Sequence, residues 1–136
     1  DFTQMSKYAP KDGPFDHDAA DSPESLLIGG AVQQHKDKAA KASPLRYVSQ
    51  DDPPFLIMHG TADPTVSFTE GMNFYNALRY YKKPAVLLAY PGEGHGLRGM
   101  ANRKDLTVRY FEFFNHYLKG APAPKWLTDG VPLLKK

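Results

Sequence analysis

One stretch of the sequence reads Phe55-Leu56-Ile57-Met58-His59-Gly60-Thr61-Ala62-Asp63. Its first four residues are apolar, and the prolines at positions 53 and 54 precede them. A short apolar run without polar alternation is typical of a strand that is buried on both faces, as the strands of parallel sheets are. We therefore predict a strand over residues 55–58, followed by a polar loop that carries Asp63.

The residues around this strand predict an alternation of strands and helices. Residues 85–90 form a second wholly apolar run, which we predict as another strand. Between the strands, residues 69–81 place four apolar residues on one helical face, namely Phe74, Ala77, Leu78 and Tyr81. Residues 102–119 predict a long helix whose aromatic stripe we expect to pack against the sheet, and that stripe contains Tyr110, Phe113, Phe114 and Tyr117. A strand, a helix and a second strand in this order indicate parallel pairing.

The regions on either side of this core lack the alternation. Residues 1–21 are polar and rich in turn residues, which favours loop. Ser22 and Pro23 then predict the start of a short helix that Gly29 ends, and residues 36–41 predict a second one. We therefore divide one α/β domain into a loop and short-helix excursion (1–50), a strand–helix–strand–helix core (51–120) and a tail (121–136).

Two parallel strands are too few for an independently stable sheet, because both outer edges would leave backbone groups unpaired. The sequence also opens at Asp1 with neither an initiator Met nor a signal peptide. We therefore expect residues 1–136 to be the C-terminal part of one catalytic domain. The N-terminal half of the same domain is then the expected partner that completes the sheet.

Two loops leave the carboxyl ends of the predicted strands, where open parallel sheets carry their functional residues. The first loop carries Asp63, and the second, Pro91-Gly92-Glu93-Gly94-His95-Gly96, carries His95 between glycines. A carboxylate and an imidazole on neighbouring loops can meet above the sheet, where the acid fixes the tautomer of the histidine and stabilises its protonated form. Asp63 and His95 are therefore the candidate catalytic residues.

These residues resemble the end of an α/β-hydrolase catalytic domain. The acid loop, followed 32 positions after Asp63 by His95, is similar to the prolyl-oligopeptidase (S9) family of serine peptidases from about Pro53 to Leu134. The earlier Ser22-Pro23-Glu24-Ser25-Leu26-Leu27-Ile28-Gly29-Gly30 resembles carboxylesterases of the acetyl-xylan and feruloyl type. The resemblance implies that Asp63 is the acid and His95 the general base of a catalytic triad.

The nucleophile that this resemblance implies has no counterpart in the sequence. None of the six serines lies in a G-x-S-x-G setting, and these serines are Ser6, Ser22, Ser25, Ser43, Ser49 and Ser67. Loss of the triad serine costs orders of magnitude in rate, so we expect this chain alone to be nearly inactive. The expected nucleophile therefore lies upstream.

We interpret the other titratable residues as structural and not as catalytic or metal-binding. Glu93 lies two residues before His95, but we interpret it as a solvated loop carboxylate or a partner of Arg98. His59 is expected to pack or hydrogen-bond at the strand end. The run Asp16-His17-Asp18 invites a metal interpretation, which we disfavour because no second histidine lies at a ligand spacing.

Composition narrows the classes of function further. The 136 residues include 17 Lys and Arg against 15 Asp and Glu, which gives no case for a nucleic-acid partner. There is no cysteine, and no apolar run approaches the roughly 20 residues of a membrane-spanning helix. The resemblance described above, together with these exclusions, predicts a serine hydrolase, S9-like, without cofactor or metal, that acts on a small ester or peptide. A carboxylesterase for esterified carbohydrates and a non-catalytic hydrolase-like module are the alternatives.

Overall fold

The computed structural model describes residues 1–130. Its α-helices are α1 (Met5–Tyr8), α2 (Pro23–Ile28), α3 (Lys36–Ala42), α4 (Phe68–Tyr80), α5 (Met100–Lys119) and α6 (Lys125–Thr128), and its strands are β1 (Phe55–Gly60) and β2 (Ala85–Tyr90). Three 3-10 turns accompany these helices: Phe2–Gln4 precedes α1, Val32–Gln34 lies between α2 and α3, and Pro44–Tyr47 lies between α3 and β1. The predicted order of strand, helix, strand and helix is therefore present.

The two strands pair in parallel, as the sequence predicts, in a register that joins Phe55 to Ala85 and Gly60 to Tyr90. β1 runs two residues beyond the predicted end at Met58, because His59 and Gly60 still pair with β2. Within residues 1–130 the sheet contains these two strands alone, so both of its outer edges are open. The described fold is a partial α/β fold.

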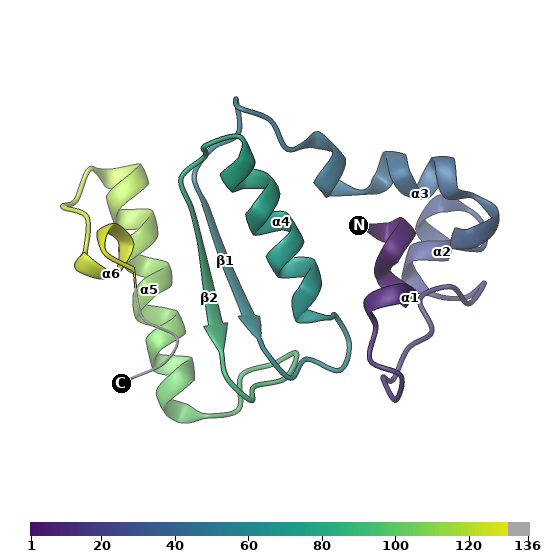
Figure 1. The fold of residues 1–136 in the computed structure, drawn as a ribbon. Helices are drawn as coiled ribbons and strands as arrows, with labels where there is room; N and C mark the ends of the chain where they lie inside the picture. The colour runs from purple at the N-terminus through teal and green to yellow at the C-terminus, as the bar shows by residue number, and fades with distance from the viewer. Residues whose placement is uncertain (131–136) are drawn as a thin grey trace.

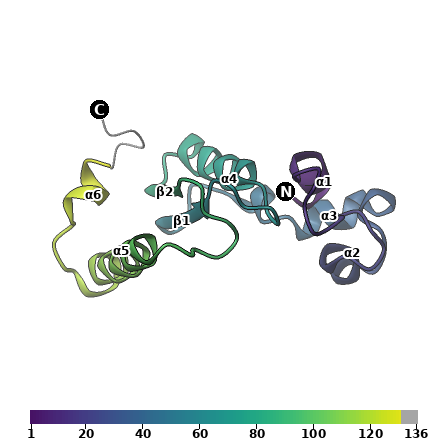
Figure 2. The same ribbon diagram turned by 90° about the horizontal axis from the view of Figure 1, so that it is seen from below.

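Helices α4 and α5 lie on opposite sides of the strand pair (Figures 1 and 2). Ser67 caps α4 by accepting the backbone N–H of Thr69, and Leu78 is fully buried on its inner face. The prediction that Tyr81 shares this face is wrong, since its side chain is 43% exposed. The helix ends at Tyr80, and Lys82 turns the chain away with a positive φ of 56°.

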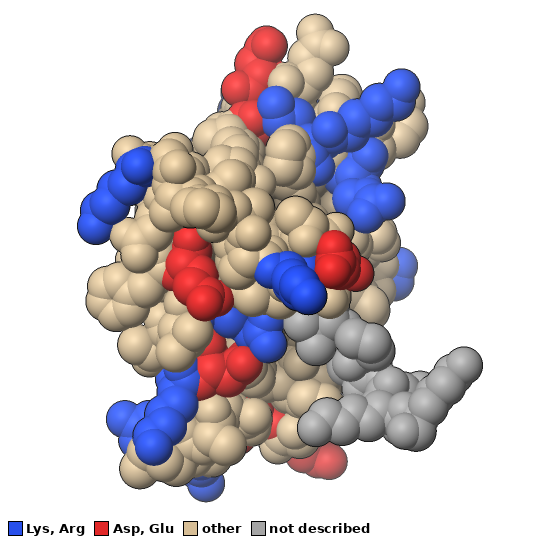
Figure 3. Space-filling model, turned by 90° about the vertical axis from the view of Figure 1, so that its left-hand side faces the viewer, with Lys and Arg blue, Asp and Glu red and all other residues tan. Residues whose placement is uncertain are grey.

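The aromatic stripe of α5 is only partly buried, which corrects a second prediction. Phe113 is buried, whereas Tyr110, Phe114 and Tyr117 are exposed. A pair of strands is too narrow to cover every ring of a 20-residue helix. Figure 3 views the molecule from the α5 side and shows charges of both signs separated by broad uncharged areas.

The N-terminal region forms a small helical unit beside α4 (Figure 1). The expectation of mostly loop over residues 1–21 misses the short turn of helix in α1. Helix α2 begins as predicted, with the Ser22 side chain accepting the Ser25 amide, and ends at Gly29 with a positive φ of 77°. A separate core of Ile28, Val32 and Ala39 holds this unit together.

The tail expected over residues 121–136 contains the short helix α6, and residues 131–136 lie outside the described part. The Trp126 indole stacks against the Arg109 guanidinium at 5.1 Å from the ring centre, which attaches α6 to α5. Among residues 1–130, no helix combines the length and apolar character needed to cross a bilayer.

Candidate active site

The loops that follow β1 and β2 are joined by backbone hydrogen bonds. The Thr61 amide donates to the Tyr90 carbonyl and the Ala62 amide donates to the Glu93 carbonyl, both at 3.0 Å. The Gly92 amide in turn donates to the Thr61 hydroxyl at 2.9 Å. These bonds hold the two loops at a fixed separation without any contribution from the side chains of Asp63 and His95.

The close approach of the loops depends on glycine at the end of β1. A Cβ atom on Gly60 would lie 2.3 Å from the Glu93 carbonyl oxygen and 2.4 Å from that of Gly94. Neither oxygen can move aside, because both belong to the backbone of the loop that carries His95. Gly60 is buried between the loops, and only a residue without a side chain fits there.

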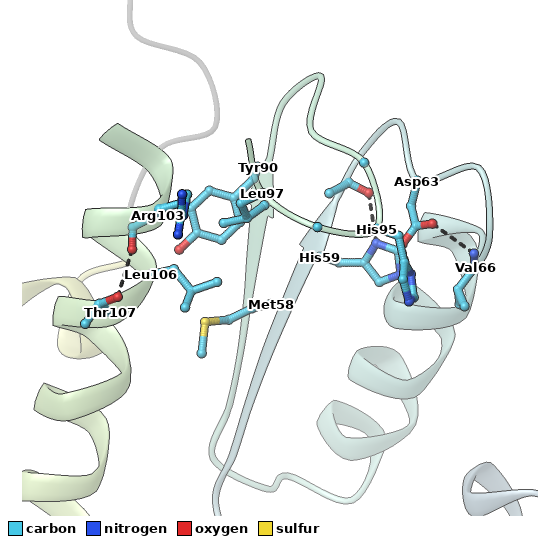
Figure 4. A pocket seen from close by; sticks show the side chains of 13 residues that line it. Met58, His59, Asp63, Val66, Tyr90, His95, Leu97, Arg103, Leu106 and Thr107 are labelled. Atoms are coloured by element: carbon cyan, nitrogen blue, oxygen red, sulfur yellow. Dashed lines mark hydrogen bonds and ion pairs between the residues drawn. The ribbon is translucent and has the colours of Figure 1, made fainter. Parts of the chain in front are cut away.

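Asp63 and His95 meet where the sequence places them, above the carboxyl ends of the parallel strands (Figure 4). Nδ1 of His95 lies 2.9 Å from Oδ2 of Asp63. The Asp63 side chain is only 5% exposed, whereas that of His95 is 62% exposed. A buried acid therefore faces one side of an imidazole whose other side is open.

The carboxylate of Asp63 is oriented by its own loop. Its second oxygen, Oδ1, accepts the amides of Thr65 at 2.8 Å and Val66 at 2.9 Å. Burial raises the pKa of Asp63, but the bonds from the Val66 amide, the His95 ring and the Thr65 amide outweigh it and hold the pKa below its usual value. Asp63 is thus an ionised acceptor at neutral pH.

This geometry determines the role that the imidazole can play. An ionised carboxylate only accepts, so Nδ1 of His95 carries the proton of the 2.9 Å contact. Nε2 is then the basic nitrogen of the neutral ring. An imidazole held in this tautomer can take a proton at Nε2, and the carboxylate stabilises the cation that results. The pair is suited to general acid–base chemistry.

The pair borders a cleft of about 520 Å³ between the sheet and α5 (Figure 4). Met58, Tyr90, Leu97 and Leu106 supply apolar walls, and Arg103 supplies a cation. The Tyr90 hydroxyl donates to Asp105 at 3.1 Å, and burial first, then the negative charge of Asp105, raise the pKa of Tyr90. Tyr90 is therefore a neutral wall residue.

Glu93 is buried, which corrects the expectation of a solvated loop carboxylate. It does contact Arg98, but through the backbone amide at 2.7 Å, and it also accepts the Gly99 amide and the Asn102 side chain at 3.0 and 2.6 Å. The Arg98 amide is the main cause that lowers the pKa of Glu93, with the Asn102 side chain next. The carboxylate thus fastens the histidine loop to the N-terminus of α5.

The other histidines take structural positions. Nδ1 of His59 lies 2.8 Å from the Gly60 carbonyl, and the ring packs edge-on against Phe68, which agrees with the packing interpretation. His17 is buried between the carboxylate of Glu24 and the carbonyl of Thr65, at 3.1 and 3.0 Å. Sequence reasoning missed this contact, because 48 positions separate His17 from Thr65. In residues 1–130, no cluster of three His, Asp or Glu side chains has a metal-binding arrangement.

All six serines belong to the described part of the chain, and none is hydrogen-bonded to His95. The Ser22 hydroxyl donates to the His17 carbonyl and accepts from the Ser25 hydroxyl at 2.9 Å. Ser49 and Ser67 accept backbone amides. The hydroxyls of Ser6 and Ser43 are buried without a hydrogen bond to any residue from 1 to 130. Among residues 1–130, the structure therefore shows no serine hydroxyl paired with the His95 imidazole.

Solved structures with a similar fold include an esterase and a peptidase. A truncated carbohydrate esterase from gut microbiota is 30% identical with a TM-score of 0.66, and the match covers 82% of this chain and 38% of that one. A puromycin-hydrolyzing peptidase of Mycobacterium tuberculosis is 24% identical with a TM-score of 0.64, over 85% of this chain and 17% of that one, and shares the fold.

The family itself follows from sequence. The family model described as BD-FAE matches residues 1–78, more than half of the 136 residues, and the chain belongs to that family. This chain is 31% identical over 74 residues to the esterase LipC of Mycobacterium tuberculosis (54% of this chain, 18% of LipC). It is 44% identical over 55 residues to the human acylamino-acid-releasing enzyme (40% of this chain, 8% of that enzyme). The chain thus spans less than a fifth of either relative, and its relatives are hydrolases.

Proposed function

We propose that this chain forms the part of a serine hydrolase that supplies the acid, Asp63, and the general base, His95, of a Ser-Asp-His triad. The 2.9 Å contact between the buried carboxylate and the exposed imidazole is the observation that carries the proposal. It joins loops from two neighbouring parallel strands, where α/β hydrolases keep their acid and histidine in this chain order.

We infer that the nucleophile lies upstream, in the N-terminal half of the same α/β-hydrolase domain. Both edges of the described sheet are open, and exposed strand edges of this kind need partners. The aromatic rings that are exposed on α5 would also be buried by the missing half of the domain. In this proposal residues 1–136 are the C-terminal part of one domain, with the excursion at 1–50, the core at 51–120 and the tail at 121–136.

The proposed reaction is acyl transfer to water. The upstream serine oxygen attacks the carbonyl carbon while Nε2 of His95 accepts the serine proton, and the leaving group departs with that proton. Water then attacks the acyl-enzyme, and His95 accepts its proton and returns it to the serine oxygen. Asp63 stays ionised throughout and stabilises the imidazolium.

Two substrate classes are candidates, and different observations favour them. The likeness to a truncated carbohydrate esterase, at 30% identity, favours a carboxylic ester on a carbohydrate. The likeness to the acylamino-acid-releasing enzyme, and to a dipeptidyl-peptidase 5 of Porphyromonas endodontalis that is 29% identical over 96 residues, favours a peptide or acylated amino acid. Acetylated and feruloylated sugars assayed beside peptide amides on the complete protein distinguish the two.

The test of the triad uses the complete protein and p-nitrophenyl acetate. We expect His95→Ala to lower kcat by about 1,000-fold or more, because the serine loses its base. His116→Ala is the matched control, since His116 lies on α5, where its ring pairs with the Ala121 carbonyl and packs against Tyr117. Hydrolysis by His95→Ala within about tenfold of the unmodified protein overturns the proposal, whereas no hydrolysis by the unmodified protein supports a non-catalytic module.

A second experiment addresses the position of the nucleophile. A fluorophosphonate probe labels activated serines, and intact mass reports the label. We expect one adduct on the complete protein and none on residues 1–136 alone. An adduct on the isolated residues that disappears in His95→Ala would mean that one of the six serines serves as nucleophile.

A further inference from the structure

We propose that His17 is a positioning residue for the acid of the triad, acting on Asp63 through a single peptide group. This inference rests on the proposed function of Asp63 and His95. It concerns a buried histidine that lies outside the pair and that the proposed reaction does not use.

The contact begins at the carbonyl of Thr65. Nε2 of His17 lies 3.0 Å from that oxygen, so this nitrogen bears a proton and donates it. The same peptide group ends in the amide of Val66, which donates to Oδ1 of Asp63 at 2.9 Å (Figure 4). One rigid, planar unit therefore accepts a hydrogen bond from His17 at one end and gives one to Asp63 at the other.

The arrangement at Nδ1 of His17 strengthens this effect. Oε1 of Glu24 lies 3.1 Å from Nδ1, and the two side chains are 7% and 11% exposed. This contact at Nδ1 fixes the ring orientation that directs Nε2 at the Thr65 carbonyl. A hydrogen bond donated to the carbonyl end polarises the peptide group and makes its N–H a stronger donor to Asp63.

The backbone around His17 is fixed independently. The Ser22 hydroxyl donates to the carbonyl of His17 at 3.0 Å, and the same hydroxyl caps helix α2. A Cβ atom on Gly13 would lie 2.7 Å from the Pro64 carbonyl, so this segment and the acid loop are in close contact. These contacts fix the position of the His17 backbone relative to the acid loop.

A continuous set of contacts links helix α2 to the imidazole. It runs from Glu24 to His17, through the Thr65–Val66 peptide group to Asp63, and on to Nδ1 of His95. Loss of the first donor leaves the Val66 amide free to rotate away from Oδ1. The carboxylate then loses part of its orientation, and His95 is held less well in the tautomer that leaves Nε2 basic.

The experiment compares two variants of similar size in the complete protein with p-nitrophenyl acetate. His17→Leu fills the space without a donor, whereas the amide of His17→Gln can still donate to the Thr65 carbonyl. We expect His17→Leu to lower kcat about tenfold or more with KM within about twofold, and His17→Gln to recover most of kcat, since a lost hydrogen bond to a charged network has effects of this size. Should His17→Leu be insoluble, His17→Met takes its place as a more adaptable apolar side chain.

Both variants are then made in the Asp63→Asn background. If His17 acts through Asp63, the Leu and Gln variants have the same kcat there, within about twofold. A decrease of equal size in both backgrounds, or equal kcat for Leu and Gln in the unmodified background, shows a packing role and overturns the inference alone. Asp63→Asn that hydrolyses within about tenfold of the unmodified protein overturns the proposed function and this inference with it.

Discussion

The acid loop at 61–67 and the histidine loop at 91–99 hold their functional side chains in opposite ways. The acid loop binds its carboxylate directly, since Asp63 accepts two amides of its own loop and is buried. The histidine loop leaves its imidazole exposed and is fixed through a neighbour, Glu93, which binds the start of α5. A general base needs an open nitrogen and its orienting acid needs a dry, fixed position, so the difference follows from their roles.

The largest expected loss of activity follows substitution of Asp63, and the corresponding substitution of Glu93 provides the comparison. Asp63→Asn in the complete protein should lower kcat by about 10,000-fold, because an amide facing Nδ1 favours the wrong tautomer. Glu93→Gln should lower kcat only about three- to tenfold, since Glu93 holds the loop and does not contact the imidazole. Steady-state kinetics with p-nitrophenyl acetate test both. Equal losses would mean that the two acids share one role.

Gly60→Ala should have the next largest effect, because it forces the two loops apart. The added methyl group would lie 2.3 Å from the Glu93 carbonyl and 2.4 Å from that of Gly94, and both are backbone atoms. We expect stability to fall by about 3 kcal/mol, as with other substitutions that overpack a buried site. Urea unfolding of the complete protein measures this.

Gly96→Ala is the matched control for Gly60→Ala. Nothing lies within 4 Å of a Cβ atom at Gly96, and this glycine belongs to the same histidine loop. We expect its stability to stay within about 0.5 kcal/mol of the unmodified protein, as for most surface substitutions. Equal stability of Gly60→Ala and Gly96→Ala would contradict the close approach of the loops.

The difference between the loops also explains which features the sequence could predict. Asp63 and His95 follow apolar runs at strand ends, and parallel pairing brings such positions together, so their contact was predictable from local pattern. The burial of Glu93 depends on amides that become free only because α5 begins at Met100, earlier than the periodicity indicates. Contacts of His17 required the N-terminal unit to fold back on the acid loop, and no local spacing encodes that.

The aromatic stripe on α5 shows that the sequence predicts which face of a helix is apolar but not how much of that face is buried. Periodicity identifies the face that carries Tyr110, Phe113 and Phe114, but it cannot say how much sheet lies beneath that face. Only Phe113 is buried against the two described strands. Tyr81 fails for a local reason, since the helix ends one residue before it.

The pH dependence of stability tests whether folding lowers the pKa of Asp63. The pKa of Asp63 is lowered in the folded state, so this group stabilises the fold above its ordinary pKa of 3.8, and the contribution is lost as pH falls from there through the lowered folded value. Urea unfolding at several pH values between about 3 and 6 should show a smaller loss on acidification for Asp63→Asn than for the unmodified protein. Parallel curves would mean that Asp63 has the same proton affinity folded and unfolded.

The smallest expected effect tests the bond that joins the loops at their outer edge. Thr61→Val removes the hydroxyl that accepts the Gly92 amide at 2.9 Å, while the backbone bonds from Thr61 and Ala62 to the histidine loop remain. Because Thr61 is exposed, water can satisfy the Gly92 amide, and we expect a loss of about 0.5–1 kcal/mol in urea unfolding with kcat within about twofold. Thr128→Val is the matched control, since that hydroxyl is exposed on α6 and bonds to the Lys125 carbonyl. A decrease in kcat of tenfold or more for Thr61→Val alone would contradict this expectation. It would show that the bond between Thr61 and Gly92, and not the hydrogen bonds of Asp63 and Glu93, controls the geometry of the Asp63–His95 pair.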